Sequence, residues 1–242
     1  MSHPGSTASR PTLPQEFAGR PLFAVSPTHP MPAPDRVVIV AHGLTAHRRT
    51  HEPEMLGLAQ LGFSVLAADA PGHGDRDDGR LAALGREPGD TARSRIFLGI
   101  IDEWAAETEA LIGHLRSLGC RVGLAGVSMG GFLTYATLTG DTRPDATAAI
   151  ISSPAWESPA GRAPHRSPDR FPPVPLLTVT AGLDETVPPD PARAFAERLR
   201  PLYADCPDRL HAVHFPDSGH MMRQEDWQAT WVEVGTWFLR HL

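Results

Sequence analysis

Short runs of apolar residues alternate with amphipathic stretches along most of the chain. Short runs rich in apolar, small and β-branched residues indicate strands at 36–41, 63–68, 121–127, 146–152, 176–181 and 210–215, of which 36–41 and 176–181 read as buried. Apolar residues repeating on one helical stripe predict helices at 53–61, 96–118, 129–139, 190–203 and 224–242. A short edge strand is expected at 21–26. Strands and helices alternating at this spacing are typical of an α/β fold, a doubly wound, mostly parallel sheet with helices on both faces.

Three stretches lack this pattern. Residues 69–95 are polar and contain five glycines, and residues 154–174 contain too many prolines for a regular helix over much of their length. We read both as long loops. A lid over the site can come from 154–174 or from 75–95, and the latter would supply apolar area through Leu81 and Leu84. Residues 1–18 also lack apolar patterning, so we expect a flexible N-terminal segment followed by one domain over 19–242.

The most specific motif is Gly126-Val127-Ser128-Met129-Gly130, which stands between the strand predicted at 121–127 and the helix predicted at 129–139. A Gly-x-Ser-x-Gly pentapeptide in this context is the nucleophile elbow, a tight turn that exposes the serine Oγ. Side chains two positions before and after the serine would collide, so both positions require glycine. Ser128 is therefore the candidate nucleophile.

Two partners for this serine follow, each on a loop after a predicted strand. Asp184 follows the strand at 176–181, and His220 follows the strand at 210–215. A serine hydroxyl needs a base in order to attack near neutral pH, and a carboxylate holds that base in the right tautomer. The order Ser128, Asp184, His220 is that of the α/β-hydrolase triad. The carboxylates that compete for the role of the acid are Glu185, Asp190 and Asp217.

Two further motifs match one family. His42-Gly43-Leu44 follows the strand at 36–41, and Asp69-Ala70-Pro71-Gly72-His73-Gly74 follows the strand at 63–68. With these motifs the chain resembles the α/β-hydrolase superfamily from about residue 35 to 242, and within it the small single-domain bacterial carboxylesterases of the dienelactone-hydrolase-like and prolyl-peptidase-like groups. Dienelactone hydrolases carry cysteine at the elbow, so that narrow activity is not expected. The resemblance implies an α/β-hydrolase fold without a full cap domain, because residues 154–174 are too few to build one.

The same residues suggest an oxyanion hole and a pocket. A tetrahedral intermediate needs backbone N–H donors, and the N–H of Met129, which also begins a helix, is one candidate. The resemblance implies that Leu44 supplies the second. We interpret His42 as a side chain that props this loop and as a candidate at the substrate pocket, together with Trp156 and Met221.

Two charged clusters have both a functional and a structural interpretation. The loop 73–78 holds one histidine and three aspartates but matches no metal-ligand spacing, so we interpret it as a solvated loop and expect no metal. The basic run 47–51 is either a solvated helix start or a rim that attracts a substrate carboxylate.

Composition narrows the remaining classes. The chain has 242 residues, of which 41% are hydrophobic and 21% charged, as in a soluble globular protein. A net charge of −6 argues against a nucleic-acid partner, and no apolar run is long enough to span a membrane. Residues 1–15 contain no apolar core of a secretory signal, so we expect a cytoplasmic protein. The oligomeric state stays open.

These features predict a serine hydrolase that cleaves small carboxylic esters through an acyl-enzyme, without a cofactor. Residues 154–174 offer only Trp156 and Phe171 as aromatic walls, and both have packing in the core as the alternative, so we expect short acyl chains, acetyl to butyryl. The same triad also serves thioesterases, small-peptide hydrolases and perhydrolases, and fold alone does not choose among them. A non-catalytic binding protein is the alternative from a different class.

Overall fold

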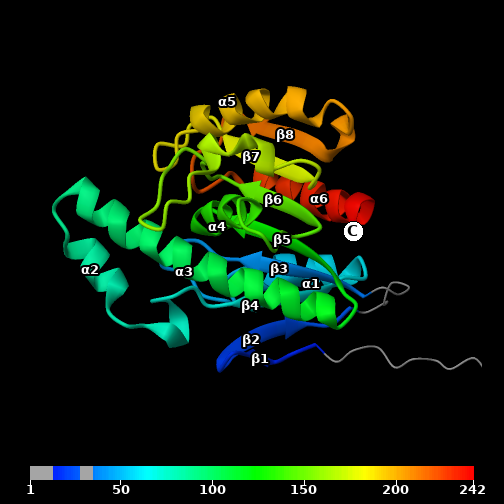
Figure 1. Ribbon diagram of the computed structural model, residues 1–242, viewed down its shortest axis with the longest axis horizontal. Helices are drawn as coiled ribbons and strands as arrows, with labels where there is room; N and C mark the ends of the chain where they lie inside the picture. The colour runs from blue at the N-terminus through cyan, green and yellow to red at the C-terminus, as the bar shows by residue number, and fades with distance from the viewer. Residues whose placement is uncertain (1–12, 28–34) are drawn as a thin grey trace, which may run out of the picture.

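The computed structural model describes residues 13–27 and 35–242. Its centre is an eight-stranded sheet in the order β1-β2-β4-β3-β5-β6-β7-β8 (Figure 1). Its strands are β1 (Glu16–Phe17), β2 (Arg20–Val25), β3 (Arg36–Ala41), β4 (Ser64–Ala68), β5 (Arg121–Val127), β6 (Ala146–Ile150), β7 (Leu176–Ala181) and β8 (Leu210–Phe215). All neighbours from β4 to β8 are parallel, whereas β2 is antiparallel to both β1 and β4. The predicted doubly wound, mostly parallel sheet is confirmed.

Helices cover both faces of the sheet. They are α1 (Glu52–Gln60), α2 (Arg80–Arg86), α3 (Asp90–Ser117), α4 (Met129–Leu138), α5 (Asp190–Leu199) and α6 (Gln224–His241). Buried side chains of α1 and α6 pack on one face, and those of α3, α4 and α5 pack on the other. In Figure 1, α2 and the first turns of α3 project on the left, beyond the end of the sheet.

Four predicted strands, β3, β5, β7 and β8, have the predicted bounds. β6 ends at residue 150 rather than 152, because Ile151 has a φ of 43° and turns the chain out of the sheet. The stretch 69–95 is not one long loop: it contains α2 and a 3-10 turn, η1 (Gly74–Arg76), and α3 begins at residue 90 rather than 96. The expected helix over 190–203 is α5 followed by a 3-10 helix, η4 (Arg200–Tyr203).

The N-terminal segment expected to be flexible is only partly described. Residues 1–12 and 28–34 lie outside the described ranges. Within the described part, β1 pairs with β2. The boundary between a flexible segment, 1–18, and a single domain, 19–242, stays a prediction. In the described ranges, no helix combines the length and the apolarity that crossing a bilayer requires.

The sheet order creates a crevice. The chain passes from β3 to β4 on one side, and from β5 to β6 on the other, so the loops that leave β3 and β5 diverge. In open parallel sheets, ligands bind at this switch point, outside the carboxyl ends of the strands. Leu44 and Ser128 lie on these two loops.

Candidate active site

Ser128 occupies a strained turn between β5 and α4. Its backbone has φ 53° and ψ −113°, a conformation that residues other than glycine rarely adopt. A Cβ at Gly126 would lie 1.9 Å from the carbonyl oxygen of Gly130, and a Cβ at Gly130 would lie 2.2 Å from that of Ala41 in β3. The predicted crowding is therefore present, but at Gly130 the neighbour is the adjacent strand.

Ser128, His220 and Asp184 form one chain of hydrogen bonds. The Oγ of Ser128 lies 2.9 Å from Nε2 of His220, and Nδ1 of His220 lies 2.7 Å from Oδ2 of Asp184. A carboxylate oxygen only accepts, so Nδ1 carries the proton and Nε2 is left to accept from the serine hydroxyl. The structure thus brings together the three residues in the tautomer that a nucleophilic serine requires.

The carboxylate of Asp184 is fixed and shielded from solvent. Its side chain is 1% exposed, and its second oxygen, Oδ1, accepts the backbone N–H groups of Thr186 and Val187 at 2.9 and 2.8 Å. All three competing carboxylates lie in the described part of the chain, and no hydrogen bond joins any of them to His220. They are the exposed residues Glu185, Asp190 and Asp217.

Two candidate oxyanion donors lie beside the serine. The N–H groups of Leu44 and Met129 donate to no backbone or side-chain group among the described residues. A Cβ at Gly43 would lie 3.6 Å from Cβ of Ser128, so the loop after β3 abuts the elbow. Free N–H groups on both sides of a nucleophile are what a developing oxyanion needs.

His42 holds the loop after β3 in place. Its Nδ1 donates to the carbonyl of Gly43 at 2.8 Å, and its Nε2 accepts the N–H of Ala70 at 3.0 Å. Burial lowers the pKa of His42 to about 4, so the ring is neutral. The side chain is 2% exposed and does not line the cavity described below, which agrees with the propping role and not with the expected place at the pocket.

Asp69 ties the same loop to the loop after β4. Its carboxylate accepts the backbone N–H of Arg48 and pairs with the guanidinium of that residue, and it also accepts the N–H of Asp75 at 3.1 Å. Burial opposes ionisation of this carboxyl, but the hydrogen bonds outweigh it, so its pKa lies below the ordinary value. Both arginines of the basic run are therefore paired, Arg48 with Asp69 and Arg49 with Glu52, and neither lines the cavity described below.

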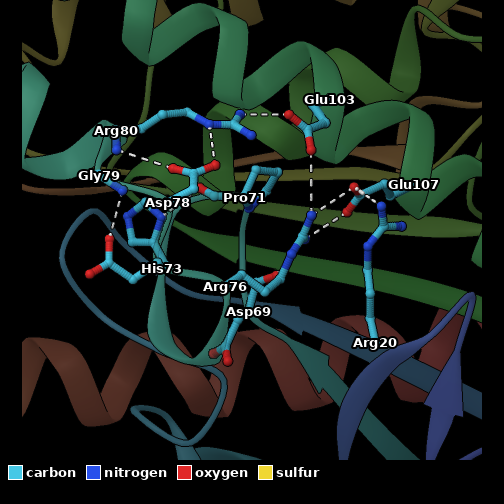
Figure 2. A network of polar contacts seen from close by, with 11 residues as sticks. Arg20, Asp69, Pro71, His73, Arg76, Asp78, Gly79, Arg80, Glu103 and Glu107 are labelled. Carbon is cyan, nitrogen blue, oxygen red and sulfur yellow. Dashed lines mark hydrogen bonds and ion pairs between the residues drawn. The ribbon is translucent and has the colours of Figure 1, made fainter.

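The side chains of the loop 73–78 are likewise occupied by contacts within the loop and with its neighbours. His73 is fully buried with its Nδ1 on the carbonyl of Pro71, Asp77 accepts the N–H of Gly79, and Asp78 pairs with Arg80. Figure 2 shows these contacts around the turn. Among the described residues, no group of three or more histidine, cysteine or acidic side chains has a metal-binding arrangement.

A cavity of about 1140 Å³ opens in front of Ser128 and His220. Because its lining comes from α2, α3 and α4 and also from the starts of α1 and α6, it extends toward both faces of the sheet. Trp156 and Met221 line it as expected, and Met221 is 90% exposed at its mouth. Phe171 does not: it is fully buried against Tyr135 and Phe195 in the core.

We divide the residues that line the cavity into two groups of different chemistry and call each an arm. The first, here called the aromatic arm, is formed by Leu84, Phe97, Leu98, Phe132 and Trp156. Its rings pack on one another, with Phe97 and Phe132 5.2 Å apart and Phe132 and Trp156 6.3 Å apart. The second, the histidine-side arm, follows the loop after His220 and is formed by Thr50, His51, Met222, Gln224 and Trp227.

The sequence anticipates only part of the aromatic arm. Of the two leucines expected on a lid formed by residues 75–95, Leu84 lines the cavity and Leu81 does not, whereas Phe97 and Leu98 of α3 were not expected there. The expectation of short acyl chains rested on residues 154–174, with a lid over 75–95 as its alternative. With α2 and α3 present, the site has a second apolar wall, and its volume exceeds what a small ester fills.

Comparisons with known proteins identify the family of the chain. The model of the family described as serine aminopeptidase, S33, matches residues 32–168, more than half of the chain; the match includes Leu44 and Ser128 but ends before Asp184 and His220. YitV from Bacillus subtilis (strain 168), by its name a candidate esterase, is 24% identical over 239 residues, covering 85% of this chain and 89% of YitV.

Solved structures resemble the whole fold. TT1662 from Thermus thermophilus has a TM-score of 0.70 and 25% identity, covering 91% of this chain and 94% of TT1662. The Pyrococcus furiosus esterase Pf2001 has a TM-score of 0.65 and 17% identity, covering 92% of this chain and 87% of the esterase. At this identity the second likeness concerns the fold alone.

Proposed function

Since the chain belongs to the serine aminopeptidase S33 family of the α/β-hydrolase superfamily, we propose that it hydrolyses carboxylic esters with Ser128 as nucleophile, His220 as base and Asp184 as the acid that orients it. The chain is a hydrolase of the carboxylesterase type. Beyond this class of enzyme, we propose the three catalytic residues, an ester as the bond that is cleaved, and an uncharged ester as the kind of substrate.

The hydrogen-bond chain from Ser128 through His220 to Asp184 is the observation that carries the proposal. In the first half of the reaction, Oγ attacks the ester carbonyl while Nε2 of His220 takes the hydroxyl proton. The N–H groups of Leu44 and Met129 receive the oxyanion. The imidazolium then protonates the leaving alkoxide, and an acyl-serine remains.

Water completes the cycle. It enters where the alcohol left, loses a proton to His220 and attacks the acyl-serine, which releases the acid and restores the hydroxyl of Ser128. The buried carboxylate of Asp184 stabilises the imidazolium in both halves without taking its proton. No step needs a group outside this chain other than substrate and water.

The charges that line the cavity favour an ester substrate over the first peptide bond of a peptide substrate. An aminopeptidase site needs an anion for the α-ammonium group of its substrate. Among the described lining residues, Asp90 is the one carboxylate, and it is exposed in the first turn of α3, close in sequence to Arg93. The remaining lining is mostly apolar, which suits the uncharged body of an ester.

The aromatic arm bears on the acyl chain. Its side chains add apolar surface that an acetyl group does not reach, so we propose short- to medium-length acyl groups, beyond the butyryl limit expected from residues 154–174. Each buried methylene contributes about 0.8 kcal/mol, which favours longer chains until the wall is met.

The test compares bonds and variants. Purified enzyme is assayed with p-nitrophenyl butyrate and with alanine p-nitroanilide, and Ser128→Ala is assayed beside it. We expect the ester to be cleaved with the higher kcat/KM, and the variant to lose several orders of magnitude while keeping its circular dichroism spectrum. Faster cleavage of the anilide makes the chain a peptidase. A variant with more than a few per cent of wild-type activity removes Ser128 from the mechanism.

A further inference from the structure

Helix α2 covers the aromatic arm with a single side chain. Leu84 is the one buried residue of the helix, and it lines the cavity that also contains Ser128. It belongs to none of the hydrophobic clusters of the core. The other side chains of α2 are exposed or half-buried. α2 therefore contributes to the site but little to the core.

Packing alone does not explain why α2 stays in place. A helix of seven residues is far below the length of about 12–15 residues at which isolated helices become marginally stable. One buried leucine adds little to this. The helix must be held by other contacts, and these are ionic.

Arg80, the first residue of α2, forms the outer contact. Its guanidinium lies 2.5 Å from Glu103 of α3 and 2.6 Å from Asp78 (Figure 2). Arg80 is 35% exposed and Glu103 is 40% exposed, so salt screens this pair. An exposed pair of this kind contributes little to stability, so it biases the position of α2 without locking it.

Arg76, in the turn before α2, forms the inner contact. It makes two hydrogen bonds of 2.8 Å to the carboxylate of Glu107, which also pairs with Arg20 of β2 at 2.8 Å. Arg76 and Glu107 are each only 16% exposed, so this pair is screened less than the outer one. Arg76 also reaches Glu103 at 3.5 Å, so this carboxylate is shared by the inner and outer contacts. The base of the segment is thus fixed to α3 and to the sheet, and within α2 itself Arg80 is the residue that pairs with α3.

Gly79 allows α2 to turn about that base. It precedes the helix with a φ of 83°, and a Cβ there would meet nothing within 4 Å. The segment 77–89 joins η1 to the start of α3, and Leu84 belongs to none of the three core clusters, so a displacement of α2 about Gly79 would break no contact within those clusters.

The aromatic arm is the one that suits the acyl group. His220 must protonate the leaving alkoxide, so the alcohol lies toward the loop that carries this histidine, which forms the histidine-side arm. The acyl group then extends the other way, past Phe132 and toward Leu84.

We propose that α2 is a hinged cover of the acyl site, held closed by the pairing of Arg80 with Glu103, and that Leu84 is the residue that limits acyl length. This inference rests on the proposed ester hydrolysis. Acyl chains that stop short of Leu84 gain contact with the closed cover, and longer chains must push α2 outward. Leu84 is therefore a specificity determinant, and Arg80 is a positioning residue that acts through α2.

The first experiment measures kcat/KM for p-nitrophenyl esters from acetate to dodecanoate. We expect Leu84→Ala to move the optimum to longer chains and Leu84→Trp to move it to shorter ones, with a change of about fourfold in kcat/KM for each methylene that gains or loses burial. Leu81→Ala is the control, because Leu81 lies on the same helix but not in the cavity lining.

The outcomes separate the two proposals. An unchanged acyl-length profile in both Leu84 variants, with esterase activity intact, overturns the role of Leu84 alone. A wild-type enzyme without Ser128-dependent esterase activity overturns the proposed function. A shift in preference among acetate esters of different alcohols, with the acyl profile unchanged, assigns the aromatic arm to the alcohol and overturns the acyl assignment.

The second experiment needs no turnover. Hydrogen exchange of the amides at 80–86 is measured at low and high salt, in wild type, in Arg80→Gln and after labelling Ser128 with an octyl phosphonate. We expect faster exchange in Arg80→Gln and at high salt, and slower exchange after labelling, with α5 unchanged throughout. Equal exchange at 80–86 in all of these states shows that α2 is a fixed wall and overturns the hinged cover.

Discussion

The Nδ1 atom of His220 lies 2.7 Å from a carboxylate oxygen of Asp184, whose other oxygen is held by two backbone N–H groups. This relationship fixes which nitrogen of the imidazole carries the proton, and so leaves the other nitrogen free for Ser128. The turn after β7 supplies both N–H groups, so the carboxylate of Asp184 is oriented by the backbone rather than by another side chain.

Replacing this carboxylate should therefore damage catalysis more than folding. In Asp184→Asn the amide can present its N–H to His220 and favour the wrong tautomer. We expect kcat to fall by about 10⁴, as in other triad enzymes. Glu185→Gln is the matched control, because Glu185 is exposed and has no hydrogen bond to His220. A larger loss in Glu185→Gln than in Asp184→Asn would transfer the role to the neighbour.

The elbow should be intolerant of a single methyl group at Gly130. The added Cβ would lie 2.2 Å from the carbonyl oxygen of Ala41, which belongs to the central strand β3. We expect Gly130→Ala to destabilise the fold by about 1–3 kcal/mol in urea unfolding, and to lower activity as the strand and the serine move apart. Gly57→Ala is the control: its Cβ meets nothing within 4 Å in α1, so it should stabilise the fold by about 0.5–1 kcal/mol. Equal effects of the two changes would contradict this geometry.

Acid should weaken the fold through His42. Its pKa is about 4 in the folded protein, against about 6.5 when unfolded, so between these values the unfolded state binds a proton that the folded state does not. The free energy of unfolding therefore falls as the pH drops from 6.5 to 4, by about 3 kcal/mol for this residue. Burial lowers the pKa of His51 and His73 as well, and these act in the same direction. Asp69, whose pKa is also lowered, weakens the fold only at more acidic pH.

Urea unfolding at pH 7 and pH 4.5 checks this expectation. His42→Gln keeps an acceptor for the N–H of Ala70 but does not titrate, so its stability should change less between the two pH values than that of wild type. The same change in both proteins would show that His42 does not carry the effect.

The sequence was most informative where burial is continuous. β3, β5 and β7 have their predicted bounds because each is a mostly buried apolar run between clear breaks. β8 also has its predicted bounds, although all its residues are exposed or half-buried. The residues of the hydrogen-bond chain were likewise readable, because Ser128, Asp184 and His220 each follow such a run. Local order along the chain was enough to place all three at one edge of the sheet.

The helix α2 and the shape of the cavity were predictable only in part: a lid over 75–95 with Leu84 was one alternative, but no helix was expected there. α2 has one buried residue, so it leaves no repeating apolar stripe, and the first turn of α3 is exposed and polar. Nor does sequence show that Trp156 turns to the cavity while Phe171 turns to the core. These choices depend on how segments dock, which the local pattern does not encode.

The central claim is that Ser128 forms the covalent intermediate, and its most direct test is mass spectrometry of the enzyme after reaction with a fluorophosphonate. The account predicts one adduct per chain, on the peptide that contains Ser128, formed by wild type and absent from Ser128→Ala. An adduct on another residue, or a wild-type chain that cleaves esters while Ser128 stays unmodified, would contradict it.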